Sequence, residues 1–145
     1  MSLVDDIATF LDASSTAFTL LSGTAGNLAK MIGLDHEHAG NTMAVIYETP
    51  GGASEFSFST STGAPTTQFE RQSFQILSRS TTWTTARSQS QVAHALLDGL
   101  TSRSLPTATG TRYIQITAVQ PPFYLQRDEN DRFIASANYD VWRET

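Results

Sequence analysis

Hydrophobic and polar positions repeat with two different periods along this chain, and the period distinguishes predicted helices from predicted strands. Apolar residues within positions 3–11 recur with the 3.6-residue spacing of an amphipathic helix. Ser2 can cap this helix, and the carboxylates of Asp5 and Asp6 suit the positive end of its dipole. Residues 81–100 give a second and longer helical pattern that starts at a threonine cap.

Strands are predicted where apolar residues form a short run or alternate with polar ones. Four stretches meet this condition: residues 42–48, a stretch beginning at about Gln68, residues 111–120 and residues 132–143. The order helix, strand, strand, helix, strand, strand is typical of an α+β fold. We therefore expect a mixed or mostly antiparallel sheet of about four strands packed against two helices.

Two long segments fit neither period. Residues 14–41 are interpreted as an ordered loop with one short helical turn around residues 27–32. The segment 50–68 is rich in serine, threonine and glycine, and Phe56 and Phe58 alternate with hydroxyl side chains in it. It is predicted to be a long loop or hairpin arm that protrudes from the body. Because exposed phenylalanines are unfavourable in a free monomer, these two are candidate contact residues.

Composition narrows the possible functions. The chain has 145 residues, which predicts one domain over residues 1–145, and its net charge is −5. Lys30 is the only lysine, so the dense cationic face of a general nucleic-acid-coating protein is missing. The absence of cysteine excludes disulfides and thiolate zinc sites. Without a basic leader or a long apolar run, we expect a soluble protein, not exported by the general route and not in a membrane.

Ligand-like side chains gather only at Asp35, His36, Glu37 and His38. A structural zinc site needs four ligands, and the third histidine, His94, falls in the middle of a predicted helix. A solvated turn is therefore the favoured interpretation, with a small metal-dependent hydrolase as the distant alternative. No nucleophile elbow or phosphate-binding loop occurs either. We expect no enzyme activity, no catalytic residues, no cofactor and no metal.

Charges of both signs follow the last predicted strand and the turn before it. The members of this group are Arg127, Asp128, Asp131, Arg132, Asp140 and Arg143. One interpretation is a solvated edge strand that its charges protect from pairing. The other is a contact between unlike surfaces of neighbouring subunits, because arginine serves interfaces better than lysine does. The near absence of lysine favours the second.

Several segments together carry a family resemblance, in their order and spacing rather than singly. They are residues 69–79, the helix end 95–100, residues 110–113, residues 120–130, and the closing stretches 132–133 and 138–143. In these the chain resembles the minor capsid or tail terminator proteins of long-tailed phages. It departs from that pattern in a longer 14–41 region and in the turn 130–132, which lacks a common glycine. Asn and Asp tolerate the left-handed geometry such a turn needs.

The resemblance implies a structural role. Such proteins form a ring, usually of six subunits, that caps the tail tube, stops its growth and joins it to the head connector. The implied partners are other copies of this chain, the major tail tube protein and the head–tail connector or stopper protein, with DNA passing through the lumen without specific binding. The implied location is the neck of the virion, assembled in the host cytoplasm. A head-completion or stopper protein of the same particle is the alternative.

Overall fold

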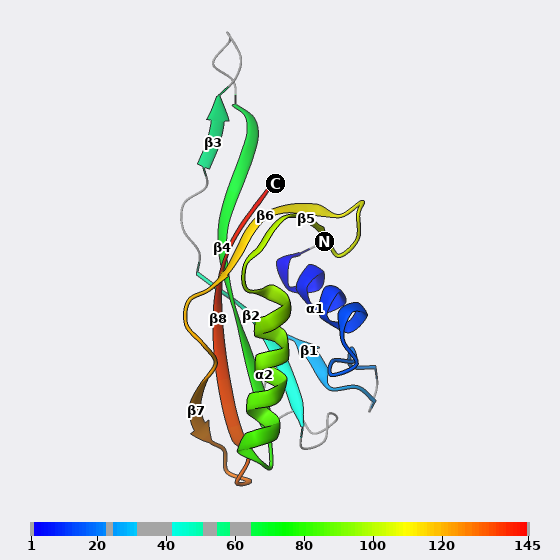
Figure 1. Cartoon of the computed structure of the whole chain (residues 1–145), viewed down its shortest axis with the longest axis vertical. Coiled ribbons are helices and arrows are strands. Elements are labelled where there is room, and N and C mark those ends of the chain that lie inside the picture. The colour runs from blue at the N-terminus through cyan, green and yellow to red at the C-terminus, as the bar shows by residue number, and fades with distance from the viewer. Residues whose placement is uncertain (1, 23–24, 32–41, 51–54, 59–64, 145) are drawn as a thin grey trace.

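A computed structural model describes residues 2–22, 25–31, 42–50, 55–58 and 65–144 (Figure 1). It contains two helices, α1 (Leu3–Ser14) and α2 (Trp83–Leu97). The strands in chain order are β1 (Leu28–Lys30), β2 (Met43–Thr49), β3 (Glu55–Phe58), β4 (Pro65–Ser80), β5 (Leu100–Leu105), β6 (Thr111–Ala118), β7 (Phe123–Arg127) and β8 (Phe133–Glu144).

The predicted fold of about four strands is wrong, because the described residues form one eight-stranded sheet with only two helices. The sheet is mixed: β1 pairs with β2 in parallel, and the other strand pairs described are antiparallel. The strands missing from the prediction are mostly three to six residues long. Segments this short show too few alternations to carry a readable period, so their neighbours decide their structure.

Two of these corrections overturn specific expectations. A helical turn was expected around residues 27–32, but residues 28–30 form strand β1, and residue 32 lies outside the described ranges. The Asn27 side chain ahead of β1 holds the preceding loop. Its amide nitrogen donates to the Ala17 carbonyl over 2.9 Å, and its oxygen accepts from the Thr19 N–H over 2.8 Å. The second predicted helix ends earlier than expected. Gly99, with φ of +82°, turns the chain directly into β5.

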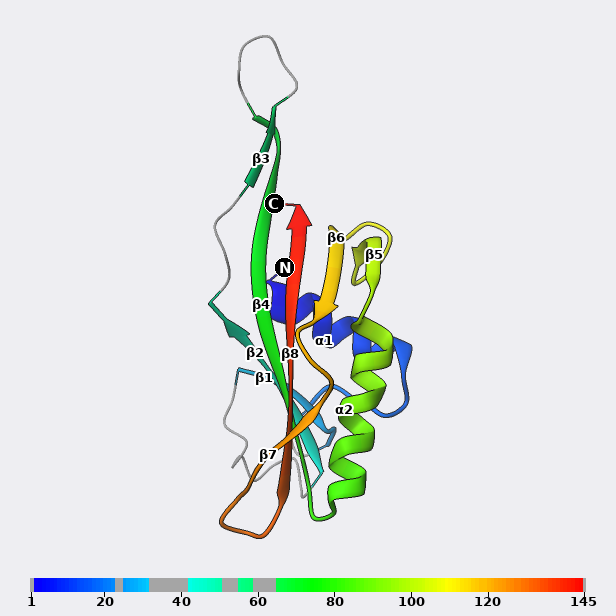
Figure 2. The same ribbon diagram turned by 60° about the vertical axis from the view of Figure 1, so that its left-hand side comes forward.

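Strands β4 and β8 form the spine of the sheet. They pair without interruption from Phe69 opposite Glu144 to Ser80 opposite Phe133. The strand order is β1-β2-β4-β8-β6-β5, with β7 added to the opposite end of β8 from β6 and β3 added to β4. Residues 65–68 of β4 extend past the last β8 partner and pair with β3 alone. Figures 1 and 2 show this two-stranded arm projecting beyond the body, where the sequence predicts a protruding hairpin.

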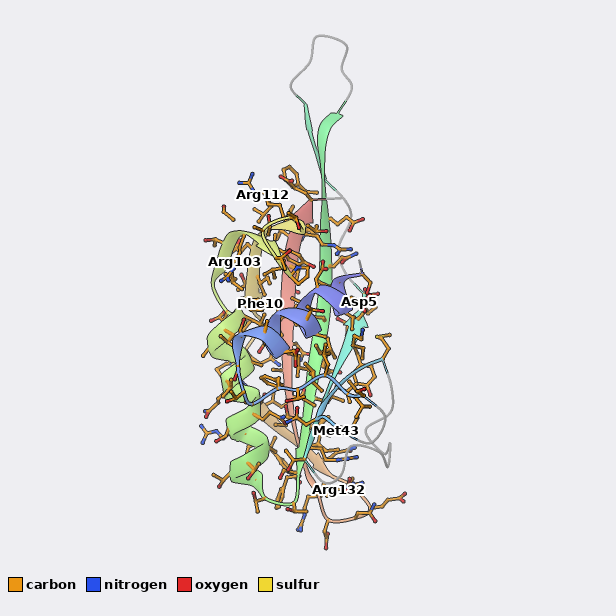
Figure 3. All side chains as sticks on the ribbon, turned by 90° about the vertical axis from the view of Figure 1, so that its right-hand side faces the viewer. Asp5, Phe10, Met43, Arg103, Arg112 and Arg132 are labelled. Atoms are coloured by element: carbon orange, nitrogen blue, oxygen red, sulfur yellow. The ribbon has the colours of Figure 1, made fainter. Side chains whose placement is uncertain are left out.

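Both helices cover the same face of the sheet (Figures 1 and 2). α1 buries Leu3, Ile7 and Leu11 completely, as its period predicts. α2 presents a narrow buried face of mostly small side chains, namely Ala86, Gln89, Ser90, Ala93 and Leu97. Under the helices, Phe74 and Tyr139 stack with ring centroids 4.9 Å apart. This layer is the main core, and at its margin the Arg103 guanidinium lies 5.0 Å from the centre of the Phe10 ring (Figure 3).

The opposite face of the spine is more polar. The Ser73 hydroxyl donates to the Asp140 carboxylate over 2.9 Å, and the Gln75 amide donates to the Ser136 hydroxyl over 3.0 Å. Farther along, the Arg71 guanidinium lies 4.9 Å from the centre of the Trp142 ring. A small apolar cluster of Ala29, Met43 and Val45 occupies the β1–β2 side of this face.

Candidate assembly interface

The part of the chain that the structure describes holds no group of three or more side chains placed to bind a metal ion. His36, Glu37 and His38, the residues of the distant hydrolase alternative, lie outside the described ranges. His94 lies on α2, with Nε2 3.8 Å from the Asp98 carboxylate. In the same described part no helix is long and apolar enough to cross a membrane.

The arm places the backbone of both phenylalanine candidates in β3. Phe56 stands opposite Gln68, and Phe58 stands opposite Pro65 after an irregularity in register. The side chains of this strand lie outside the described part of the structure. A two-stranded ribbon is only marginally stable by itself in water. Binding to a partner would therefore stabilise the arm.

Four of the charged candidates form one turn between β7 and β8. Asp128 accepts from the Arg132 side chain over 2.6 Å and from the backbone N–H groups of Asn130 and Arg132 over 2.9 and 2.8 Å. Burial raises the pKa of Asp128, but these hydrogen bonds outweigh it and the net pKa shift is downward. Asp131 sits at φ +57°, in the left-handed region that aspartate tolerates better than most residues do. The turn is thus held by its own side chains.

The arginines at the two ends of the charged group, Arg127 and Arg143, differ in environment. Arg127 is exposed, lies 3.4 Å from the Asp131 carboxylate, and stacks with its guanidinium 4.7 Å from the centre of the Phe133 ring. Arg143 points into the body, where its side chain is only 12% exposed. Asp140 faces the polar side of the spine and accepts from Ser73. The group is therefore split over three places, and each charge has a partner within the chain.

Arg143 belongs to a buried network that joins four elements. The Tyr113 hydroxyl on β6 donates to the Asp6 carboxylate on α1 over 2.7 Å. Arg143 Nη1 lies 3.4 Å from that hydroxyl and 3.6 Å from the Asp6 carboxylate, and its Nε lies 3.3 Å from Glu70 on β4. Burial raises the pKa of Asp6, and the hydrogen bond from Tyr113 and the charge of Arg143 oppose that rise. The network ties α1 to the spine where the arm emerges.

Sequence reasoning assigned Asp6 to helix-start electrostatics and missed this network. A signal was present, because Asp6 lies three residues after Leu3 and four before Phe10 and so falls within the apolar stripe of α1. Tyr113 and Glu70 carried no comparable signal. Their meeting depends on the register of β4, β8 and β6.

A cluster of aromatic rings at the other end of the body was also not predicted. Trp83, at the start of α2, meets Tyr124 of β7 edge to face at 5.5 Å between centroids, and Phe133 lies 6.5 and 6.3 Å from these two rings. Tyr124 and its neighbour Leu125 are 49% and 44% exposed. On the polar side of the sheet, a groove of about 400 Å³ runs between Leu77, Ile134 and Leu125 and the turn residues 126–130 and 132. This edge combines exposed apolar side chains with a preformed hollow.

Comparison with curated proteins gives no match. Among solved structures, the chain is similar to a chain of the "Virion of native gene transfer agent (GTA) particle". The likeness has a TM-score of 0.63 and 12% sequence identity, and it covers 99% of this chain and 96% of that chain. At 12% identity, this structural similarity shows a shared fold and nothing about function.

The sequence of residues 34–144 matches the family described as bacteriophage tail terminator protein. The match includes every strand from β2 to β8 and the whole of α2. It also takes in the turn, the arm and three of the four elements of the buried network. The protein is a virion structural protein that belongs to the bacteriophage tail terminator family.

Proposed function

We propose that this protein is the tail terminator of its phage particle. In this role it forms a ring, of six subunits, that caps the tail tube, stops its polymerisation and joins it to the head connector. The observation that carries the proposal is the family match over residues 34–144. The protein acts by binding and catalyses no reaction.

Two features of the fold support a ring. A closed head-to-tail ring needs two unlike surfaces on each subunit, one complementary to the other. The sheet offers unlike edges, because β3 and β1 lie on one side of the β4–β8 spine and β7, β6 and β5 lie on the other. The arm adds a projecting segment that can reach a neighbouring subunit or the major tail tube protein.

The acidic net charge of the chain supports the expectation that DNA passes through the ring without being bound. The chain carries 14 acidic and 9 basic side chains, and several of the arginines are engaged in internal pairs. A lumen built from such subunits holds few free cations to bind phosphates. DNA then passes through without specific binding. Assembly takes place in the host cytoplasm, and the partners are the tail tube and the connector or stopper protein.

The test is to produce particles from a phage genome in which this gene is silenced by a stop codon, and to image them. A terminator limits tube growth, so its loss should give free heads and tubes of uncontrolled, greater length. The alternative, a head-completion or stopper protein, predicts tubes of normal length that fail to join heads. Supplying the intact protein from a plasmid should restore joined particles. Normal infectious particles without the protein would refute both functions.

A further inference from the structure

Exposed apolar side chains in the described part of the chain are concentrated at one edge of the sheet. The large hydrophobic residues with high exposure are Met31, Val119, Tyr124 and Leu125, at 55, 58, 49 and 44%. Three of these four fall within residues 119–125, the stretch that leads from β6 into β7. We call Val119, Tyr124 and Leu125 the edge patch. Clustering of this kind marks an interaction surface, whereas single exposed apolar residues are ordinary.

The free edge of β7 is poorly suited to backbone pairing with a strand of a partner. β7 pairs with β8 on one side, and no described strand occupies its other side. The register moves from Tyr124 opposite Ala135 to Gln126 opposite Ile134, so Leu125 is the extra residue of a β-bulge. A bulge interrupts the row of backbone groups that an incoming strand would need, and it redirects the bulged side chain. Docking here therefore relies on side chains.

Aromatic packing restrains Tyr124 of the edge patch before any partner binds. Tyr124 rests edge-on against Trp83, and Phe133 stacks with Arg127 beside them. Aromatic and arginine side chains are enriched at the energetic centres of protein interfaces. Rings already restrained by neighbours lose little conformational entropy on binding. The groove of about 400 Å³ beside Leu125, with Leu77 and Ile134 in its wall, offers space for an apolar side chain of the partner.

The absence of charge on the edge patch favours a second copy of this acidic chain as the partner. Residues 113–126 contain no charged side chain, although the chain as a whole carries −5. In the adjoining turn, Arg127 lies 3.4 Å from Asp131 and Arg132 lies 2.6 Å from Asp128, so both arginines are paired within the chain. Copies of an acidic protein repel one another least where their contact surfaces are uncharged.

We propose that the edge patch packs against a second copy of this chain, as one of the two unlike surfaces of a head-to-tail contact. The inference deepens the proposed function, because a ring requires such a contact. It differs from the charged-turn contact expected from the sequence. In this contact the apolar residues of β7 supply the binding energy, and the charged turn forms their polar rim.

The first experiment places a photo-crosslinking amino acid, benzoylphenylalanine, at position 125 in particles assembled in infected cells. Irradiation should yield a product of twice the chain's mass that contains only this protein. Crosslinking solely to a different virion protein would show that the edge patch binds that protein, and would overturn the proposal. If the chain-to-chain product forms but phage lacking the gene has normal tails, the proposed function fails and the contact stands.

The second experiment compares two substitutions, Leu125→Asp in the edge patch and Ala95→Asp on α2. Both replace an exposed apolar side chain by the same charge, and α2 covers a face of the sheet and belongs to neither of its edges. Leu125→Asp should weaken self-association by at least about tenfold in sedimentation or native mass spectrometry, with circular dichroism unchanged. Ala95→Asp should leave it within about twofold. Equal self-association of Leu125→Asp and wild type would overturn the proposal. A failure of Leu125→Asp to fold would leave the decision to the crosslink.

Discussion

The hydroxyl of Tyr113 on β6 donates a 2.7 Å hydrogen bond to the carboxylate of Asp6 on α1, although 107 positions separate the two residues. Neither side chain reaches solvent to any useful degree, since Asp6 is completely buried and Tyr113 is 1% exposed. This bond fixes the first helix over the sheet at the end from which the arm projects. The network of Asp6, Tyr113, Arg143 and Glu70 is therefore a polar constraint inside the fold.

Tyr113→Phe should therefore destabilise the protein by about 1–3 kcal/mol, because a buried carboxylate oxygen loses its donor while the ring still fills its space. Urea unfolding followed by circular dichroism measures the change. A double-mutant cycle with Asp6→Asn should show coupling between the two positions. Additive effects would mean that the bond contributes nothing in solution.

The stability of the protein should depend on pH through Asp5. Lys30 donates to Asp5 over 2.7 Å and, together with Ser2, lowers the pKa of that carboxyl from 3.8 to about 2. The folded state then holds its proton less tightly than the unfolded chain, so the contribution is present above pH 4 and lost as the pH falls towards 2. The stability difference between wild type and Asp5→Asn should shrink over that range. A constant difference would refute the pairing.

The contribution of Asp6 to stability should change with pH in the opposite direction to that of Asp5. Because burial raises its pKa in the folded state, the folded state binds this proton more tightly than the unfolded chain does. The resulting contribution is complete below pH 3.8 and is lost as the pH rises through the folded-state pKa. Wild type should therefore lose stability relative to Asp6→Asn as the pH rises from 3.5 to 7. Thermal unfolding at a series of pH values tests the slope, and the reverse slope would exclude a raised pKa.

The left-handed position at Asp131 predicts a graded response in the β7–β8 turn. Asp131→Gly should leave stability unchanged or slightly higher, because glycine adopts φ +57° without a steric penalty. Asp131→Val should cost about 1–2 kcal/mol, since a β-branched side chain clashes in that conformation. Thermal unfolding of the two variants provides a matched pair. Equal stability of the glycine and valine forms would contradict the geometry.

The arm should be dispensable for folding and necessary for function. Residues 65–68 pair with β3 alone, whereas β4 from Phe69 onward pairs with β8. Deleting residues 53–65 should therefore leave a folded protein that no longer completes tails. Amides of β3 should exchange faster than those of residues 71–79 in the free protein, and they should become protected in assembled tails. Infectious particles made with the deletion variant would show that the arm is a passive loop.

The histidine pair gives a prediction about chemistry. The double variant His36→Ala with His38→Ala should fold and assemble as wild type does, because a solvated turn gives these side chains no structural task. Elemental analysis of the purified protein should find less than one equivalent of zinc or another transition metal. A stoichiometric metal that disappears in the double variant would restore the hydrolase alternative.

The sequence by itself determined the elements that carry their own period. α1, α2, β2, β6 and β8 lie close to their predicted positions, because amphipathic spacing over seven or more residues is a local property of the chain. The turn at residues 128–131 was predictable for a similar reason, since Asp and Asn side chains bond to their own backbone. The family resemblance also rested on these elements, and the family match confirms it.

Only the tertiary structure decided the rest. The short strands β1, β5 and β7 form because a longer neighbour offers its backbone groups, and a three- to six-residue segment cannot signal this in advance. The same holds for the charges. Arg143 lies inside the body and Arg127 on its surface, although both read as edge arginines, because strand register selects which residue meets Asp6, Tyr113 and Glu70. Pairing between distant segments therefore decided which residues are buried and which stay exposed in the candidate interface.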